Sequence, residues 1–327
     1  AAVKRSKEEK WGYIDKTGVF VIQPKYEMAY RFEGGLAWVV QGDKKRIMID
    51  STGAIVSELA VDDFSIFSED LVAVQIENKW GYMDKKGKIV IPAKYTEIGY
   101  FEDGFTTVKT EGKWGIIDKQ GNFIISPQFN SLSLFHEDLA VAGIEDKFGF
   151  INRKGAFSIA PQYKAALDFS HGVAIVRKEA SWGLINKKGD WVAEPQYQDI
   201  QEFSEGLAVV YVYKQDIDKT LYGYIDTTGR LVLPLQYTSA APFSEGRAYV
   251  ATDSVTGYID YSGNFIFKQK NTKDRQRRYN YDFEGDDYSY YNYRYMLNGF
   301  RGGMALVDDN GTFGFIDKTG AWVIPPQ

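Results

Sequence analysis

Cysteine is absent from this chain of 327 residues, and histidine occurs only as His136 and His171. The absence of cysteine excludes disulfides, thiolate metal ligands and cysteine nucleophiles. Two scattered histidines argue against Ser/His/Asp or Cys/His catalysis and against a multi-histidine metal site. Both histidines fall in a turn where related segments carry Glu or Ser, so we expect them to face solvent.

The chain also lacks a basic excess and long apolar runs. Its 39 Lys and Arg are mixed with 44 Asp and Glu, giving a net charge of −5, which argues against a nucleic-acid surface. No apolar run approaches the roughly 18 residues of a membrane-spanning helix. No glycine-rich phosphate loop and no compact calcium loop are found either. We therefore expect no cofactor, no metal, no nucleic-acid partner and no transmembrane segment.

One motif, by contrast, recurs along the whole chain. Trp-Gly-Tyr-Ile-Asp-Lys-Thr-Gly occupies residues 11–18, and copies of it begin at residues 11, 46, 80, 114, 148, 182, 222, 256 and 313. From 46 to 182 the starts are 34 residues apart. A fixed period of this size indicates a repeat architecture, in which each unit buries its apolar face by stacking on its neighbours. Residues 1–327 are therefore predicted to form a single array.

Each repeat is predicted to begin as a β-hairpin. Residues 182–186 alternate in the manner of a strand, and residues 186–189 resemble a tight turn with Asn first and Gly fourth. Asp or Asn can bond the backbone ahead of it, and glycine takes the left-handed conformation. Residues 191–193 form the return strand, which Pro195 is expected to end or to place at an outer edge.

A second turn is predicted later in each repeat, after a short fourth strand that precedes Phe203. The pattern Phe-Ser-Glu-Gly-Leu-Ala occupies residues 203–208, and Asp70 or Asp138 replaces its glycine in two repeats. Asp is a residue tolerated at positive φ, so a left-handed turn is expected there. The fold class is therefore all-β, a tandem repeat of nine antiparallel meander modules of about 34 residues that resemble propeller blades.

These motifs resemble the signature of the WG-repeat (KWG-repeat) family of bacteria. The resemblance is carried by Lys79–Gly87 with Ile89–Tyr95 and by Lys113–Gly121, and it extends over nearly the entire chain. It implies a β-repeat scaffold that serves in binding. The copy at Arg46 has lost both the aromatic residue and the glycine, and the copy at Thr256 has lost the aromatic residue. Those two modules are expected to pack differently.

The number of repeats bears on whether the array closes. Propellers typically close with about four to eight blades, whereas nine copies are present here. The sequence begins within the strand before Trp11 and leaves no N-terminal strand to complete the last module. We therefore favour an open superhelical or solenoid array, with a closed β-propeller as the alternative.

Two insertions interrupt the period, at about residues 211–221 and 268–298. The first is expected to protrude as a hairpin, and the second is rich in tyrosine. Long loops on regular scaffolds often carry function, and tyrosine provides contact area at low entropic cost. Packing of the second insertion on its own scaffold remains an alternative. The binding candidates are Tyr211, Tyr213, Arg275, Arg277, Arg278, Tyr279, Tyr281, Tyr288, Tyr290, Tyr291, Tyr293 and Tyr295.

Tryptophan offers a different candidate surface. The motif residues Trp11, Trp80, Trp114 and Trp182 recur with the period of a stacked core, so we predict that they pack rather than bind sugars. Trp38, Trp191 and Trp322 lie off the motif position and are better glycan candidates. Trp191 and Trp322 therefore join the binding candidates.

The leading interpretation is a non-enzymatic scaffold that binds another macromolecule, expected to be a protein, through its repeat surface and the Tyr-rich insertion. A glycan- or cell-wall-binding module using exposed aromatic residues is the alternative. A carboxylate-dependent enzyme acting on polysaccharide comes third. The small residues Ala1 and Ala2 resemble the end of a cleaved signal peptide, and the lack of cysteine fits an exported and a cytosolic protein alike. We therefore expect a bacterial protein exported to the periplasm or cell surface rather than a cytoplasmic one.

Overall fold

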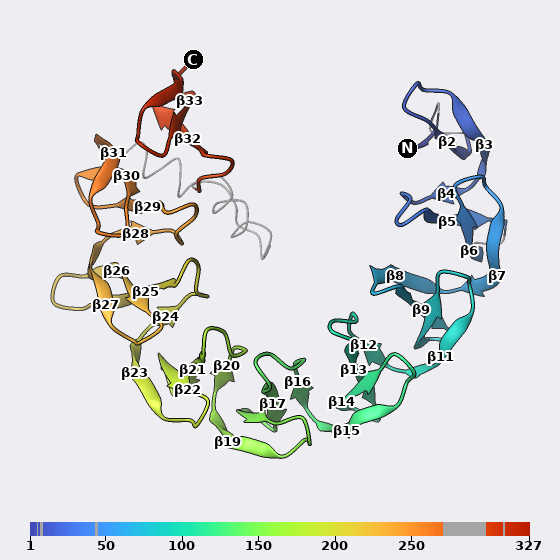
Figure 1. Ribbon diagram of the computed structural model, residues 1–327, viewed down its shortest axis with the longest axis horizontal. Coiled ribbons are helices and arrows are strands. Elements are labelled where there is room, and N and C mark those ends of the chain that lie inside the picture. The colour runs from blue at the N-terminus through green and yellow to red at the C-terminus, as the bar shows by residue number, and fades with distance from the viewer. Residues whose placement is uncertain (5, 7–8, 43–44, 271–298, 310) are drawn as a thin grey trace. The chain divides into compact units, whose positions relative to one another are not determined.

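The computed structural model describes residues 1–4, 6, 9–42, 45–270, 299–309 and 311–327. Within these residues the strands form nine antiparallel sheets, seven of four strands and two of three (Figure 1). Each sheet is built from one continuous stretch of chain, and we number these sheets as modules 1 to 9. The predicted all-β meander repeat is confirmed.

The chain divides into two compact units, Ala1–Pro161 and Gln162–Gln327. The first unit holds modules 1 to 5, apart from the last two residues of β19. Module 1 consists of β1 (Ala2–Val3), β2 (Trp11–Ile14) and β3 (Phe20–Tyr26), and module 2 of β4 (Met28–Ala29), β5 (Leu36–Gln41), β6 (Lys45–Asp50) and β7 (Ile55–Val61). Module 3 consists of β8 (Asp63–Ser68), β9 (Leu71–Ile76), β10 (Lys79–Asp84) and β11 (Ile89–Tyr95), and module 4 of β12 (Glu97–Ile98), β13 (Phe105–Thr110), β14 (Lys113–Asp118) and β15 (Phe123–Phe129). Module 5 consists of β16 (Ser131–Leu132), β17 (Ala140–Ile144), β18 (Lys147–Ile151) and β19 (Phe157–Tyr163).

The second unit holds modules 6 to 9. Module 6 consists of β20 (Ala165–Ala166), β21 (Val173–Lys178), β22 (Ser181–Asn186) and β23 (Trp191–Tyr197), and module 7 of β24 (Asp199–Ile200), β25 (Leu207–Lys214), β26 (Lys219–Asp226) and β27 (Leu231–Tyr237). Module 8 consists of β28 (Ser239–Ala240), β29 (Ala248–Ala251), β30 (Val255–Ile259) and β31 (Phe265–Lys270), and module 9 of β32 (Met304–Asp309), β33 (Thr312–Asp317) and β34 (Trp322–Ile324). The two-residue strands confirm the short strand expected before the Phe turn.

Within each unit, successive modules lie side by side in chain order. The last strand of one module contacts the second strand of the next, as β3 does with β5, β11 with β13, and β23 with β25. Among the described residues, the main strand contacts between modules join consecutive modules. Each unit is therefore an open row of modules, as the open-array interpretation predicts.

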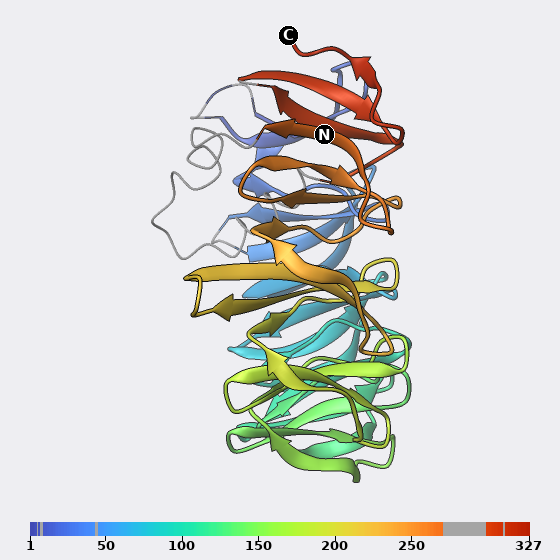
Figure 2. The same ribbon diagram turned by 90° about the vertical axis from the view of Figure 1, so that its left-hand side faces the viewer.

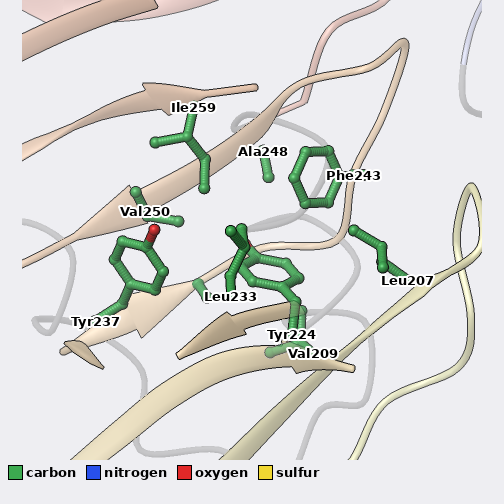
Figure 3. Close-up of a cluster of buried hydrophobic side chains, with 10 residues drawn as sticks. Leu207, Val209, Tyr224, Leu233, Tyr237, Phe243, Ala248, Val250 and Ile259 are labelled. Carbon is green, nitrogen blue, oxygen red and sulfur yellow. The ribbon is translucent and has the colours of Figure 1, made fainter. Parts of the chain in front are cut away.

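The hydrophobic core lies between modules rather than within one. Between modules 7 and 8, Tyr224 and Leu233 of the former pack with Phe243 and Val250 of the latter, all 5% exposed or less (Figure 3). Full burial of a side chain of this size contributes about 1.5–3 kcal/mol. Comparable clusters join six other pairs of neighbouring modules. Because a sheet alone leaves this face uncovered, stability depends on stacking.

The Trp-Gly strand faces a bulge in its partner. Trp182 pairs with Tyr197 but Leu184 pairs with Ala193, so two residues of β22 span four residues of β23. Pro195 does not end the return strand, because β23 continues to Tyr197, but β23 is an edge strand of its sheet, so the alternative prediction of an outer-edge position is confirmed. The bulge removes Pro195 from the ladder, and its missing N–H therefore costs no hydrogen bond.

Both predicted turns are confirmed. In the first, Asp15 Oδ1 accepts the N–H groups of Thr17 and Val19 at 2.8 and 3.1 Å, and Gly18 has φ of 87°. The hydrogen bond from the Thr17 hydroxyl, followed by those from the backbone, lowers the pKa of Asp15. All nine copies place Asp or Asn in this role.

In the second turn two successive residues are left-handed. Glu205 has φ of 52° and Gly206 of 82°, and Ser204 and Leu207 exchange backbone hydrogen bonds of 2.9 and 3.1 Å. This is the geometry of a two-residue type I′ hairpin. Asp70 and Asp138 take the glycine position with φ of 70° and 72°, as their residue type predicts.

The two degraded copies differ in their effect. In module 2, Arg46 pairs with Val61 and Met48 with Ser57, so the bulge persists although Ile47 replaces the glycine. In module 8, Thr256 pairs with Gln269 and Gly257 with Lys268, without that bulge. The register is therefore altered at Thr256 and kept at Arg46, but Ile47 joins the core cluster between modules 1 and 2, where other copies have glycine.

Candidate functional site

The first insertion forms the longest hairpin among the described residues. Strands β25 and β26 have eight residues each, and their ladder continues through Val212 and Leu221 to Lys214 and Lys219. Figure 2 shows this gold hairpin projecting beyond the hairpins of the neighbouring sheets of its unit. The predicted protrusion is present.

The tip of this hairpin combines exposed apolar surface with local restraints. Tyr213 is 45% exposed and Ile217 is 50% exposed. The Tyr213 hydroxyl donates to the Asp218 carboxylate, which raises the pKa of Tyr213. Lys219 Nζ lies 2.6 Å from Asp253 Oδ2 of module 8. Of the predicted pair, Tyr213 is thus presented to solvent in an ordered hairpin.

Tyr211 lies lower on the same hairpin and is half-buried. Its ring centroid is 5.1 Å from that of Tyr222 on β26, a tilted cross-strand pair. Pairs of this kind stabilise a hairpin by up to about 1 kcal/mol. Tyr211 therefore supports the hairpin that carries Tyr213.

The three off-motif tryptophans have different environments. Trp38 is 5% exposed and stacks on Phe64 at 4.6 Å, so it belongs to the core. Trp191 is half-buried, with Tyr163 edge-on at 5.9 Å and Lys178 Nζ 5.9 Å from its ring. Trp322 is 37% exposed and is the most accessible of the three. Trp38 is therefore removed as a glycan candidate.

The motif tryptophans are half-buried and pack against the clusters between modules. Trp11, Trp80, Trp114 and Trp182 each adjoin one such cluster. A cation lies over three of them, with Lys109 Nζ 5.5 Å from the Trp114 ring as one example. These contacts support the packing interpretation over sugar stacking.

The remaining binding candidates of the second insertion lie outside the described residues. They are Arg275, Arg277, Arg278, Tyr279, Tyr281, Tyr288, Tyr290, Tyr291, Tyr293 and Tyr295.

The two histidines lie on separate turns. His171 is exposed as predicted, has φ of 56°, and places Nδ1 2.8 Å from Ser170 Oγ. His136 is half-buried, contrary to expectation, because its ring faces module 4, with Nε2 3.9 Å from Glu102 Oε1. Across the described residues, His, Asp and Glu form no group of three or more suited to a metal ion. In the same part of the chain, no helix has the length and apolarity to cross a membrane.

A recurring carboxylate contact, which the sequence reasoning missed, joins successive modules at the type I′ turns. Glu205 of module 7 accepts the N–H groups of Glu245 and Gly246 of module 8 at 2.7 and 2.9 Å. The Tyr261 hydroxyl donates to the same carboxylate at 2.8 Å. Ser204 Oγ donates to the Phe243 carbonyl at 2.7 Å. We call this arrangement a closed joint.

Two further closed joints use a lysine as the additional donor. Glu245 accepts the Gly303 N–H at 2.9 Å, and Lys318 Nζ lies 2.9 Å from its carboxylate. Glu69 accepts the Gly104 N–H at 3.0 Å, with Lys119 Nζ at 3.0 Å. Hydrogen bonds from these lysines are the largest cause of a lowered pKa at both glutamates. The sequence did offer a signal for these joints, namely the recurring Glu in the predicted left-handed turn. A residue other than glycine is uncommon at positive φ, so its recurrence there indicates a role.

The joint between modules 4 and 5 departs from this pattern. Asp103 stands where the longer Glu is found, and Glu102 stands where Ser donates. Arg153 occupies the lysine position, but its Nε lies 3.0 Å from Asp138 Oδ1 of its own module. A pocket of about 120 Å³ lies here, lined by Glu102, Asp103, Phe105, Leu134, Phe135 and Arg153. We call it the open joint.

Comparison with family models assigns the repeat. The family described as "WG containing repeat" matches in eight stretches, residues 11–44, 48–80, 80–114, 114–148, 148–180, 182–213, 222–254 and 313–327. The chain belongs to the WG-repeat family. The structure adds a ninth module, β28–β31, whose Thr256 copy begins no match.

Solved structures similar to this WG-repeat chain are remote. One is described as the crystal structure of the eukaryotic initiation factor, with 13% identity, 73% of this chain and 72% of that chain covered, and a TM-score of 0.45. Another is PorZ, a bacterial surface component of the type-IX secretion system of Porphyromonas gingivalis, at 11% identity, 80% and 44% coverage, and TM-score 0.29. A third is a Bacteroides caccae protein of unknown function, with 12% identity, 58% of this chain and 89% of that chain covered, and a TM-score of 0.27. A search of curated proteins gives no significant match.

The WG-repeat signature has a structural explanation in this chain. Its Trp-Gly glycine lies against the bulge, where a Cβ on Gly183 would be 2.6 Å from the Ala193 carbonyl oxygen. Its later Ser-Glu pair forms the closed joints. Both elements serve the backbone and the stacking of modules.

Proposed function

We propose that this WG-repeat chain is a non-enzymatic scaffold that binds another protein. The observation that carries the proposal is the ordered hairpin of β25 and β26, which presents Tyr213 and Ile217 to solvent at 45% and 50% exposure. Tyrosine and aliphatic side chains that project into solvent from a protruding hairpin are suited to insertion into a partner's pocket.

Order at the hairpin supports binding over mere exposure. The ladder runs to Lys214 and Lys219, Tyr213 is bonded to Asp218, and Lys219 is paired with Asp253. Association normally costs about 0.5–1.5 kcal/mol for each rotamer-rich side chain that it immobilises. A hairpin restrained before binding avoids part of that cost, so its contact area contributes more to affinity.

The test compares matched surface variants in affinity capture from cell-envelope and cytosolic extracts. The double variant Tyr213→Ser/Ile217→Ser removes the hairpin tip. The control Tyr100→Ser/Ile66→Ser removes residues that are 57% and 52% exposed in other modules. We expect a protein captured by the native chain and the control to be recovered at least about tenfold less with the hairpin variant, equivalent to about 1.4 kcal/mol. Equal recovery by all three chains would contradict the assignment.

A second arm concerns the Tyr-rich insertion, which we propose as the other binding element. Deletion of residues 271–298 is expected to reduce capture while the repeat array keeps its circular-dichroism spectrum. Loss of that spectrum would instead mark the insertion as part of the fold.

A glycan-binding module is the second candidate, and the exposure of Trp322 favours it. Trp322 is 37% exposed, and the Phe267 ring lies edge-on at 5.4 Å from its ring as support. Sugar binding predicts quenching of tryptophan fluorescence by cell-wall oligosaccharides and loss of that quenching in Trp322→Ala. Trp191→Ala is the control, because Trp191 is half-buried. Quenching that persists in Trp322→Ala would reject this site.

We also propose that the protein is exported and acts without turnover. The exposed position of His171 on a turn supports the lack of catalysis, because a general base works best in a site that excludes water. Fractionation of source cells tests the first point, and incubation with cell-envelope polysaccharide followed by reducing-end analysis tests the second.

A further inference from the structure

The closed joints show which chemical group the turn carboxylate takes. At two of them this group is a lysine ammonium, with Lys119 Nζ 3.0 Å from Glu69 and Lys318 Nζ 2.9 Å from Glu245. In each case the lysine comes from the Asp-Lys turn of the next module. The chain therefore contains two internal examples of one site, a carboxylate of one turn beside an alkylammonium from its neighbour.

The joint between modules 2 and 3 lacks the carboxylate. Gly34 stands at the glutamate position, and Lys85 at the lysine position pairs with Asp70 of its own module. A Cβ on Gly34 would still be 3.9 Å from Lys85 Nζ. The ammonium thus remains beside the turn even where no carboxylate is provided.

The open joint has the reverse composition, carboxylates without the ammonium. Arg153 replaces lysine, pairs with Asp138 and places its guanidinium carbon 5.1 Å from the Phe135 ring centroid. In the described part of the chain, neither Glu102 nor Asp103 has a lysine or arginine within ion-pair distance. The nearest cationic candidate is His136, whose Nε2 is 3.9 Å from Glu102 Oε1, too long for a hydrogen bond.

The pocket beside these carboxylates suits a short alkyl chain. Phe105, Leu134 and Phe135 provide apolar walls, and its volume is about 120 Å³. Sites for drug-sized ligands measure about 300–1,000 Å³. A chain of four or five heavy atoms therefore fits its scale, and a drug-sized ligand does not.

We propose that the open joint binds a primary alkylammonium group, with Glu102 and Asp103 as acceptors and Phe105 and Phe135 along its alkyl chain. The group would take the place that Lys119 and Lys318 fill in the closed joints. The same chemistry is offered by the side chain of a lysine on a partner protein and by a free alkylamine. This inference is independent of the proposed role of the hairpin.

The test is titration with n-butylammonium chloride, monitored by the ¹H–¹⁵N NMR signals of residues 102–105, with sodium chloride and n-butanol as controls. We expect saturable shifts with the amine alone and a Kd of about 1–10 mM, as suits five heavy atoms. The variant Glu102→Gln/Asp103→Asn is expected to weaken binding at least about tenfold. The control Glu97→Gln/Glu111→Gln removes two carboxylates from the same module and should leave Kd unchanged. Non-saturating shifts, or saturable shifts equal in both variants, would overturn the proposal.

Two exchanges between joints test the internal comparison. Asp103→Glu/Arg153→Lys copies the closed joint and should abolish amine binding while the chain stays folded. Lys119→Met removes the ammonium beside Glu69 and should create a second saturable site for n-butylammonium. Failure of both exchanges would reject the comparison even if the native chain bound the amine.

A final arm sorts the source of the group. A blocked lysine peptide and n-butylammonium should compete for one site. Tighter binding of the peptide points to a partner's lysine, and equal binding points to a free amine. Absence of competition would overturn the proposal.

Discussion

Gly183→Ala perturbs the position that defines the repeat, and the structure predicts the sign and the size of its effect. An alanine Cβ would lie 2.6 Å from the Ala193 carbonyl oxygen, 2.9 Å from Pro195 N and 3.0 Å from Trp191 Cζ3. The first two atoms belong to the bulged backbone of β23, so a rotamer change cannot relieve the contact. The backbone of β22 or β23 must move.

Two opposing effects set the magnitude. Overpacking in a well-packed region typically costs about 1–3 kcal/mol. Replacing glycine by alanine also lowers the entropy of the unfolded chain, which stabilises the fold by about 0.4–1 kcal/mol where the conformation is compatible. The steric cost is therefore expected to exceed the entropic gain, and the free energy of unfolding should fall by about 1–2 kcal/mol.

Amide hydrogen exchange is the suitable assay, because long repeat arrays need not unfold as one unit and exchange reports each module separately. Exchange limited by opening of β22 and β23 should become about 5- to 30-fold faster, since 1.4 kcal/mol corresponds to tenfold. Amides of β13 and β14 in the first unit should be unchanged and provide an internal reference.

The control is Gly206→Asn. Gly206 has φ of 82° and nothing within 4 Å of its would-be Cβ, so it tests conformation without a contact. Asn tolerates positive φ, and Asp70 and Asp138 occupy the equivalent position in modules 3 and 5. We therefore expect the free energy of unfolding to change by no more than about 0.5 kcal/mol. The reasoning is refuted if Gly183→Ala exchanges as slowly as the native chain, or if Gly206→Asn has the larger effect.

Three other predictions concern the core, the joints and the hairpin. Tyr224→Phe should destabilise module 7 by about 1–2 kcal/mol, because Tyr224 is buried and its hydroxyl donates to the Ala241 carbonyl at 2.8 Å. Amide hydrogen exchange in module 7 measures this effect, and an unchanged exchange rate would show that the hydroxyl is not needed. Glu69→Gln/Glu245→Gln should lower the thermal midpoint at pH 7 and have a progressively smaller effect as the pH falls. Both pKa values are lowered in the folded chain, so their stabilisation is present above the unfolded Glu pKa of about 4.3 and is lost as pH falls through the folded values. A midpoint difference that stays constant from pH 7 to pH 3 would contradict this. Tyr213→Phe should leave stability within about 0.5 kcal/mol, because its hydroxyl bonds only an exposed carboxylate; a larger loss would show that the hairpin tip supports the fold.

Local features of the repeat could be predicted because they depend on few neighbours. An Asp or Asn followed three residues later by glycine specifies a turn through its own hydrogen bonds, as at Asp15 and Gly18. Asp70 likewise indicates a left-handed backbone position. The protruding hairpin is predicted by the extra residues between Trp182 and Tyr222, whatever the surroundings.

Features that involve a second strand or module could not be predicted in the same way. Pro195 predicts either a strand end or an edge strand, and only the register with β22 reveals that an edge strand continues past it through a bulge. Trp38 lies off the motif position and could not be distinguished from Trp322 until Phe64 was placed on its ring. A contact such as that of Trp38 with Phe64 cannot be inferred from the local sequence, because the two residues lie in different repeats.

The sequence by itself determined the repeat period, the all-β class and the turn at each Asp-x-x-Gly, because these are set by residue types and spacing within one module. The tertiary structure decided which glycines are required by close contact, which tryptophans are covered and where the carboxylate of Glu69 or Glu205 meets its neighbour. It also separated the closed joints from the open joint at Glu102 and Asp103. The physical reason is that a carboxylate and its partner 35 residues or more along the chain become neighbours only when the modules stack.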